Sequence, residues 1–453
     1  MSPSDLALGL DVGAVRTKAA TATASWHGPS VFADTPAGRR HGAAALLDTA
    51  PGTAAETVLR HGFADAGAAD GLGEFLGGVI RPGGPVDLDP RRTAVVLAAP
   101  DAWTRGTGDT WTAAVEALPT GVAVRRVLTE SVGFASARLV PGAQCVAAAH
   151  LAEHPDTDGC LLVCDVGAST VTAAVLACRA GTTRLLDAEH GDVTGTGLAR
   201  RLLRAAGPDA AGDPEWRLLA LEHARCLGAR RARIVLDRAA THERYLDTPA
   251  YLAGGHGAAL TARAVVAALR PLADLVTRVV ATLLDRVAEP LLPDLVATGG
   301  NVLGPVAAAL AELGDRVHRL DPGAAARGAW RIATGRATAL DGYPHELGVA
   351  VRRVEHGLLR AETLPITATA PVTLDVRRDH HGPLPVRVRL NRAGPWRETS
   401  SAARLRAGTY QVTALGNRAG LGAVLLRPVA GGPDVVCPLG PEPGPVVTER
   451  GAR

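Results

Sequence analysis

Apolar residues occur along the chain in two patterns, which predict strands alternating with helices. Short apolar or alternating runs predict strands at residues 6–10, 19–23, 93–98, 122–128, 160–164, 171–176, 183–188, 232–236 and 295–298. Helical spacing predicts helices at residues 110–118, 130–138, 195–206, 215–231, 261–287, 306–313 and 324–334. The longest of these, 261–287, carries its apolar residues on one stripe, as in a helix that covers a sheet. The alternation indicates an α/β fold.

The pattern changes near residue 341 and becomes typical of β structure. Period-two runs at residues 347–351, 372–376, 386–390, 410–415 and 423–428 are separated by Gly, Pro and Asn turns. The chain beyond Pro438 is rich in proline and is expected to be frayed. A small all-β domain is therefore predicted after the α/β region.

Two segments repeat one arrangement of strand, aspartate, glycine turn and second strand. The first carries Asp11 and Gly13, and the second carries Asp165 and Gly167, each pair at the end of an apolar run. The backbone N–H groups of such turns can point at a phosphate, and a strand-end aspartate can hold a hydrated Mg²⁺ ion. A single turn of this kind is more often an ordinary hairpin. Two copies, each opening an α/β half, are much more specific for phosphate binding.

A third motif, Ala-Thr-Gly-Gly-Asn at residues 297–301, lies between a predicted strand and a helix that begins at Pro305. A glycine pair at a helix entrance lets a nucleoside pack against the backbone. An ordinary strand-to-helix turn is an equally good interpretation of this motif alone.

Composition narrows the classes of function. The net charge is +3 and Lys18 is the only lysine, which gives no basic signature for nucleic acid or an anionic membrane. No apolar run reaches the roughly 18 residues of a membrane span, and no basic signal-peptide region precedes Asp5, so we expect a cytoplasmic protein. The six cysteines lack zinc-site spacing and are expected to be mostly buried thiols. The histidines are too widely spread in the sequence to indicate a metal site.

The order of these motifs resembles that of the actin-like ATPase superfamily, and finer matches resemble the DnaK-like chaperones of the heat shock protein 70 family. Residues 128–131 resemble the family's Asn-Glu-Pro-Thr segment, 222–225 its Glu-Arg-Ala-Lys stretch at adenine, and 298–305 its adenosine segment. Residues 340–348, Leu-Asp-Gly-Tyr-Pro-His-Glu-Leu-Gly, resemble its linker and the first strand of its peptide-binding domain. The resemblance covers nearly the whole chain and is strongest up to about Pro365.

The resemblance implies a duplicated, two-lobed actin-like (ribonuclease H-like) ATPase domain with a small C-terminal all-β domain. Lobe I would span residues 1–157, lobe II 158–336, the linker 337–344, the peptide-binding β domain 345–438 and a tail 439–453. It implies ATP or ADP and Mg²⁺ as cofactors. The implied partners are an unfolded protein or peptide, held by the β domain, and a co-chaperone, with the chain itself a monomer. No helical pattern long enough for a lid follows the β domain.

The resemblance also implies roles for individual residues. Catalytic roles fall on Asp11, Glu130, Asp165 and Thr170, with Asp11 and Asp165 holding the metal through water. The implied nucleotide contacts are Gly13, Ala14, Val15, Gly167, Ala168, Ser169, Gly195, Thr196, Gly197, Glu222, Arg225, Gly299, Gly300 and Asn301.

This chain departs from the family where the attacking water would be positioned. Leu46 stands at the position of the family's water-orienting lysine, and Thr172 at that of its second loop aspartate. Losing a group that positions water commonly costs orders of magnitude in rate, whereas binding through backbone N–H groups can survive. We therefore expect ATP binding with slow or residual hydrolysis.

The function expected from the sequence is a chaperone-like one, in which this slow ATPase is coupled to binding of a protein or peptide. Residues 337–339, Ala-Thr-Ala, replace an apolar leucine run in the linker, so weak coupling is predicted. One alternative is a non-enzymatic nucleotide-sensing scaffold, which Leu46 and Thr172 favour. Another is a small-molecule kinase of the same fold, against which the C-terminal β region argues.

Overall fold

The computed structural model describes residues 6–35, 38–47, 55–57, 68–100, 119–206, 221, 225, 228–251, 259–286, 291–340, 346–356, 358–367, 371–389, 396–416 and 422–439. The chain divides into two compact units. The first unit comprises residues 1–103 and 118–339, and the second comprises residues 104–117 and 340–453. Helices and sheets are mixed in the first unit, which confirms the predicted α/β class.

A five-stranded sheet in the first unit has the order β3-β2-β1-β7-β8. Its strands are β1 (Ala7–Val12), β2 (Arg16–Ala20), β3 (Ser25–Pro29), β7 (Ala94–Ala99) and β8 (Ser136–Pro141). β1, β2 and β3 form an antiparallel meander, and β7 and β8 continue the sheet on the other side of β1 as parallel strands.

A six-stranded sheet repeats this topology. It contains β9 (Gly159–Val166), β10 (Thr170–Arg179), β11 (Thr182–Asp192), β14 (Leu291–Thr298), β15 (Arg316–Arg319) and β16 (Thr338–Leu340). Its order is β15-β14-β9-β10-β11-β16. β9, β10 and β11 form an antiparallel meander, and β14 and β15 run parallel to β9 on its other side. Apart from the added edge strand β16, the two sheets share one strand order and one pattern of directions.

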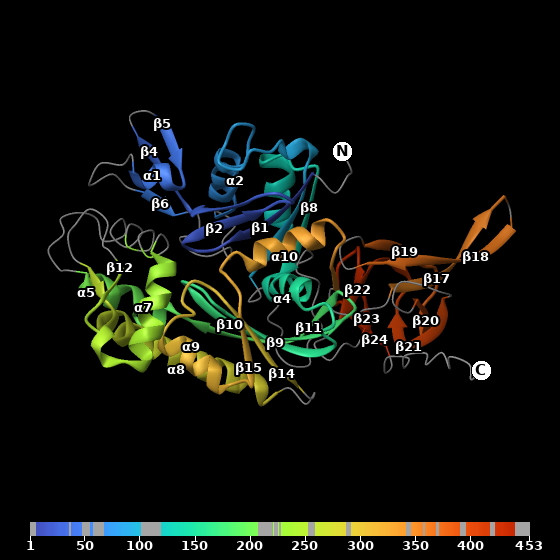
Figure 1. Ribbon diagram of the computed structural model, residues 1–453. Helices are drawn as coiled ribbons and strands as arrows, with labels where there is room; N and C mark the ends of the chain where they lie inside the picture. The colour runs from blue at the N-terminus through green and yellow to red at the C-terminus, as the bar shows by residue number, and fades with distance from the viewer. Residues whose placement is uncertain are drawn as a thin grey trace, which may run out of the picture. The chain divides into compact units, whose positions relative to one another are not determined.

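Helices α4 (Gly142–Glu153) and α10 (Ala324–Ala333) pack against each other between these sheets (Figure 1). α4 carries apolar residues on every side and is buried from Ala143 to Leu151, as expected of a helix that is covered all round. Two glycines permit the close approach of the backbones. A Cβ atom on Gly9 of β1 would lie 2.0 Å from the Ala326 carbonyl oxygen, and one on Gly328 of α10 would lie 1.6 Å from the Cys145 carbonyl oxygen.

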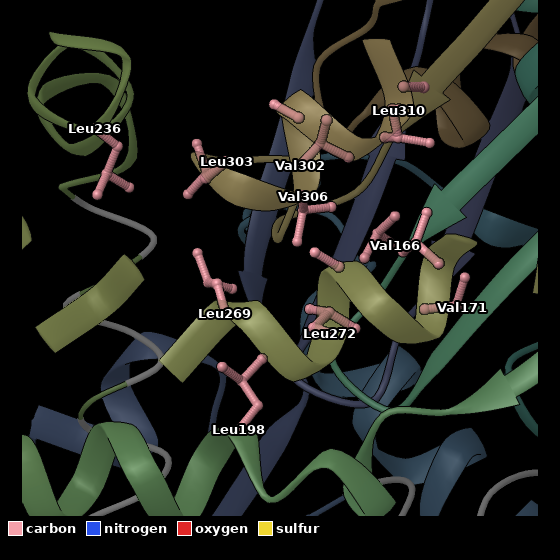
Figure 2. Close-up of a cluster of buried hydrophobic side chains, with 14 of the residues drawn as sticks. Val166, Val171, Leu198, Leu236, Leu269, Leu272, Val302, Leu303, Val306 and Leu310 are labelled. Carbon is pink, nitrogen blue, oxygen red and sulfur yellow. The ribbon is translucent and has the colours of Figure 1, made fainter. Parts of the chain in front are cut away.

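The other face of the six-stranded sheet is covered by helices α5 (Leu198–Ala205), α7 (Ala229–Thr241), α8 (Ala262–Leu284) and α9 (Pro305–Glu312). Figure 2 shows Leu269 and Leu272 of α8 in the same apolar cluster as Leu198 of α5 and Val306 of α9. The buried residues of α8 follow the stripe predicted from the sequence, which confirms this long helix.

The first unit also contains two small sheets, one of β4 (Val31–Thr35), β5 (Gly38–His41) and β6 (Ala55–Thr57) and the other of β12 (Pro249–Tyr251) and β13 (Leu260–Thr261). Its further described helices are α1 (Ala43–Leu47), α2 (Ala68–Val79), α3 (Pro119–Arg126), a π-helix (Val127–Ser131) and the 3₁₀ helices Pro90–Arg92, Thr194–Thr196 and Glu243–Tyr245.

The second unit contains two antiparallel four-stranded sheets, as the sequence predicts for a β domain. One is β18-β17-β20-β21 and the other is β19-β22-β23-β24. Their strands are β17 (Glu346–Glu355), β18 (Leu358–Ile366), β19 (Val372–Val376), β20 (His380–Arg389), β21 (Arg397–Leu405), β22 (Gly408–Gly416), β23 (Gly422–Pro428) and β24 (Val435–Pro438). Both sheets contribute to one apolar core, which makes a sandwich.

Three predicted elements are wrong. Residues 122–128, predicted as a strand, lie in α3 and the π-helix, where Val124, Val127 and Leu128 are buried at helical spacing. Residues 130–138, predicted as a helix, are broken by Gly133 at φ +87° and continue into β8. Residues 232–236, predicted as a strand, lie in α7, because so short an apolar stretch as Ala-Arg-Ile-Val-Leu fits a helix as well as a sheet.

Five cysteines lie among the described residues, and each of them is a thiol outside any disulfide. Four of these are buried and Cys160 is half-buried, in agreement with the prediction from their spacing. No helix within the described part of the chain is long and apolar enough to cross a membrane.

Candidate functional site

The two aspartate turns have the same local geometry. In the first, the Gly13 N–H donates to the Arg16 carbonyl oxygen at 3.0 Å, and in the second the Gly167 N–H donates to the Thr170 carbonyl oxygen at 2.9 Å. Asp11 and Asp165 each precede the last residue of their strand, β1 and β9. The repeated sequence therefore folds into a repeated turn, one on each large sheet.

Lys18 links these turns electrostatically. It lies opposite Asp11 in the β1–β2 ladder, and its Nζ atom is 2.9 Å from Asp11 Oδ2. Burial acts to lower the pKa of Lys18, but the charges of Asp11 and Asp165 outweigh burial and raise the pKa above its usual value. The ammonium group therefore stays charged beside the first turn.

Asp165 is a half-buried carboxyl group near other charges. Burial and then the negative charge of Asp11 raise its pKa, the Lys18 ammonium opposes both, and the resulting pKa is about 6. Two carboxylates and one ammonium group thus act on one another where the repeated strands end. Carboxylates in this setting suit a cation that arrives with its own water shell.

Thr17 of β2 and Ser30, the residue after β3, hold the first turn in place. Ser30 donates from its hydroxyl to the Gly13 carbonyl oxygen at 2.7 Å and from its N–H to the Val15 carbonyl oxygen at 2.9 Å. The Thr17 hydroxyl lies 2.9 Å from the Ser30 hydroxyl in a buried pair. Ala14 and Val15 are half-buried within this turn. The hydrogen bonds from Ser30 therefore fix the backbone on both sides of Ala14.

The second glycine turn is hydrogen-bonded to the segment that precedes α5. The Val193 N–H donates to the Ser169 carbonyl oxygen at 2.9 Å, and Val193 precedes the 3₁₀ turn Thr194–Thr196. Ala168 and Thr170 are exposed, as is Gly195. Gly197, at φ +65°, leads into α5. The hydrogen bond between Val193 and Ser169 holds the start of the 3₁₀ turn against the second glycine turn.

The Gly-Gly-Asn segment packs directly against the second aspartate. Gly299 has φ +107°, and a Cβ atom there would lie 2.3 Å from the Val166 carbonyl oxygen and 2.6 Å from Asp165 Oδ1. Only glycine fits at this point, whereas Gly300 is exposed and has open space around it. The register of β14 with β9 pairs Thr298 with Asp165 and explains the contact.

Asn301 connects the implied adenine stretch to the second turn. Its Nδ2 donates to the Gly167 carbonyl oxygen at 2.7 Å, and its Oδ1 accepts from Arg225 Nη2 at 2.8 Å. Both Asn301 and Arg225 are buried, and the Arg225 guanidinium also lies 5.5 Å from the centre of the Tyr251 ring. The amide of Asn301 therefore links Arg225 to the second glycine turn through two buried hydrogen bonds.

Other implied residues have different surroundings. Glu130 is on the π-helix, exposed, and paired with Arg126 at 3.2 Å. The Thr172 hydroxyl lies 3.1 Å from His190 Nδ1 in a buried pair. Leu46 belongs to α1, and Glu222 lies outside the described residues.

Sequence reasoning missed the roles of Lys18 and Ser30 and also a group of histidines. Lys18 and Asp11 flank the first glycine turn, so the pairing could have been found from the hairpin register. Histidines 150, 154 and 318 come together although the sequence indicated no histidine site. Only the spacing of four between His150 and His154 was visible in the sequence.

No protein-family model matches this chain, and a search of curated proteins finds none that is similar to it.

Proposed function

We propose that the first unit is a duplicated actin-like domain that binds ATP or ADP with Mg²⁺ at its two glycine turns. The observation that carries the proposal is the repeat in structure. Two sheets share one strand order, and each has an aspartate and a glycine turn, closed by the same hydrogen bond, at the end of its first strand. The mutual influence of Asp11, Lys18 and Asp165 supports one shared site for the two turns.

The chemical groups at the two turns are of the kinds that bind a magnesium nucleotide, namely backbone N–H groups for phosphate and carboxylates for Mg²⁺. Partly exposed backbone at Ala168, Ser169 and Gly195 offers N–H groups to phosphate oxygens. Asp165 and Asp11 would hold Mg²⁺ through its waters, and the ion would supply positive charge for the phosphates. The open space at Gly300 suits the packing of a nucleoside against the backbone.

Hydrolysis at this site is proposed to be slow or residual. The carboxylate of Asp11 is already engaged by Lys18, and the hydroxyl of Thr172 is engaged by His190. Neither group is therefore as available to orient an attacking water as a free carboxylate would be. The chain binds nucleotide better than it turns it over.

The second unit is proposed to hold an extended peptide, which makes the whole chain chaperone-like. A sandwich of two four-stranded antiparallel sheets has edge strands that can pair with an added strand through main-chain hydrogen bonds. Slow nucleotide turnover in the first unit would regulate this binding. Peptide binding is tested by the anisotropy of labelled unstructured peptides with and without Mg-ADP.

The decisive experiment is calorimetric titration of Mg-ADP and Mg-ATP into the full chain. We expect saturable binding that is weakened at least about tenfold by Asp165→Ala, because a carboxylate in the metal shell is lost. Asp158→Ala is the matched control, since Asp158 is exposed just before the same strand. Absence of binding at millimolar Mg-nucleotide would sink the proposal.

A nucleotide-sensing scaffold is the second candidate, and the Lys18–Asp11 ion pair favours it. A scaffold binds nucleotide without cleaving it. Single-turnover measurement with excess protein over ATP separates the two functions, because the chaperone-like reading requires formation of ADP and the scaffold does not.

A further inference from the structure

Three histidines that lie apart in the sequence form a compact group in the first unit. His150 is in the last turn of α4, His154 is the residue that ends this helix, and His318 is on β15. One ring nitrogen from each lies within 4.8 Å of the others, and the ring centres are 4.4 to 4.9 Å apart. The sequence separation of four places the first two on one side of the helix end.

His150 is unusual for a histidine because it is almost fully buried and one of its ring nitrogens lacks a hydrogen-bond partner in the described part of the chain. His150 is 1% exposed, and its Nδ1 atom is buried with no hydrogen-bond partner among the described residues. A buried polar atom without a partner destabilises the folded state, and a bound ligand would remove this cost. The buried Nδ1 atom of His150 is therefore suited to a ligand that can use its lone pair, such as a metal ion.

An aspartate completes the group. Asp294 of β14 has its Oδ2 atom 3.6 Å from His318 Nε2, on the strand that pairs with β15. A carboxylate beside a coordinating histidine fixes the orientation of the ring and raises its basicity. His154 and His318 are half-buried, so the group is reached from solvent on one side.

We propose that His150, His154 and His318 bind one zinc ion, with Asp294 orienting His318 and water completing the coordination. Tetrahedral zinc with bonds of about 2.0–2.1 Å places its ligand nitrogens roughly 3.3 Å apart. Small side-chain rotations from the present 4.8 Å spacing reach that geometry. Imidazole ligands also suit Co²⁺ and Ni²⁺ but not Mg²⁺, so this site is chemically distinct from the proposed nucleotide site.

The ion would tie the end of α4 to β15 at the edge of the six-stranded sheet. The site lies away from the second glycine turn. On β14, Thr298 is paired with Asp165 next to that turn, and Asp294 is four residues earlier on the same strand. A strand rises about 3.3 Å per residue, so the two positions are separated along it by four such steps. We therefore expect zinc to stabilise the first unit, with an effect that does not require bound nucleotide.

The test uses the full chain without a polyhistidine tag. The chain is stripped with a chelator, and Zn²⁺ is titrated calorimetrically. We expect one ion bound per chain and a rise in melting temperature that follows the fraction bound. His154→Asn and His318→Gln should each weaken binding at least about tenfold, and Asp294→Asn by about 10–100-fold, the usual range for a residue that orients a ligand.

His242→Gln is the matched control, because His242 also ends a helix, α7, and is exposed. Cobalt titration identifies the ligand type, since bound Co²⁺ should show visible absorption without a thiolate charge-transfer band. Failure to bind Zn²⁺, or binding that all three variants leave unchanged, overturns the proposal. If one variant does not fold, the other two decide, because they change different elements.

Discussion

Lys18 and Asp11 face each other across the β1–β2 ladder with 2.9 Å between the ammonium nitrogen and the carboxylate oxygen. Only 20% and 18% of these side chains are exposed. A mostly buried ion pair is a weak source of stability by itself, but removal of one partner leaves a charge without compensation. The pair also places a fixed cation at the turn where the proposed Mg²⁺ would act.

Replacing Lys18 by Met should therefore lower the free energy of unfolding by about 1–3 kcal/mol, less than for a fully buried pair because some solvent reaches Asp11. Mg²⁺ should restore part of the loss by binding at Asp11, whereas it should change the native chain little. Urea unfolding with and without Mg²⁺ measures both effects. Lys18→Arg, which keeps the cation, is the control, and equal stability of Lys18→Met and the native chain would contradict the prediction.

Asn301 should matter for both stability and nucleotide binding. Asn301→Ala removes the donor to the Gly167 carbonyl oxygen and an acceptor for Arg225, so we expect a loss of about 1–3 kcal/mol and weaker nucleotide binding.

Asn301→Asp separates the two contacts of this amide. It keeps an oxygen for Arg225 but removes the amide donor to the second turn. It should be less destabilised than Asn301→Ala, while its nucleotide affinity falls to a similar degree. Chemical denaturation and Mg-ADP titration measure these effects. Nucleotide affinity equal to that of the native chain in Asn301→Asp would show that the bond to Gly167 does not set the turn.

The spacing of apolar residues along the chain predicted most of the central strands and α8, because each of these elements has a continuously buried face. They failed for residues 232–236, because five residues, Ala-Arg-Ile-Val-Leu, are too few to distinguish a helical from a strand period. The two glycine turns could be predicted from the sequence because each is closed by a hydrogen bond between residues only three positions apart. The pairing of His318 with α4 was not, since it depends on how the strands of the sheet are ordered.

Gly328 and Gly77 are both helical glycines, yet the same substitution should have opposite effects on them. A Cβ atom at Gly328 would lie 1.6 Å from the Cys145 carbonyl oxygen of α4, a backbone atom that cannot turn away. Gly328→Ala should therefore cost about 3 kcal/mol, at the upper end of overpacking.

Gly77, in α2, is exposed and has no atom within 4 Å of such a Cβ. Gly77→Ala should stabilise by about 0.5–1 kcal/mol, because alanine favours a helix. Thermal unfolding of both variants provides the comparison. Tolerance of Gly328→Ala would mean that α4 and α10 are not in the close contact described above.

Asp321, which lies just before α10, should make the stability of the first unit depend on pH. Its Oδ1 atom accepts from the Gly323 N–H at 2.8 Å, and its Oδ2 atom lies 2.5 Å from Arg327 Nη1. Partial burial raises the pKa of Asp321, but the Arg327 guanidinium and the Gly323 N–H outweigh burial, and the pKa is lowered below its usual value. A carboxyl with a lowered pKa stabilises the folded state above its unfolded pKa and loses this contribution as pH falls through the folded pKa.

Asp321→Asn should therefore destabilise the chain at pH 7, by no more than about 1 kcal/mol because the carboxylate is largely in solvent. The difference from the native chain should shrink as pH falls below about 4, where the native carboxyl is increasingly protonated. Urea midpoints between pH 7 and pH 3 measure this trend, with the exposed Asp315→Asn as a control just before β15. Asn keeps an oxygen for the Gly323 N–H, so a deficit that stays constant to pH 3 would assign the effect to packing instead of charge.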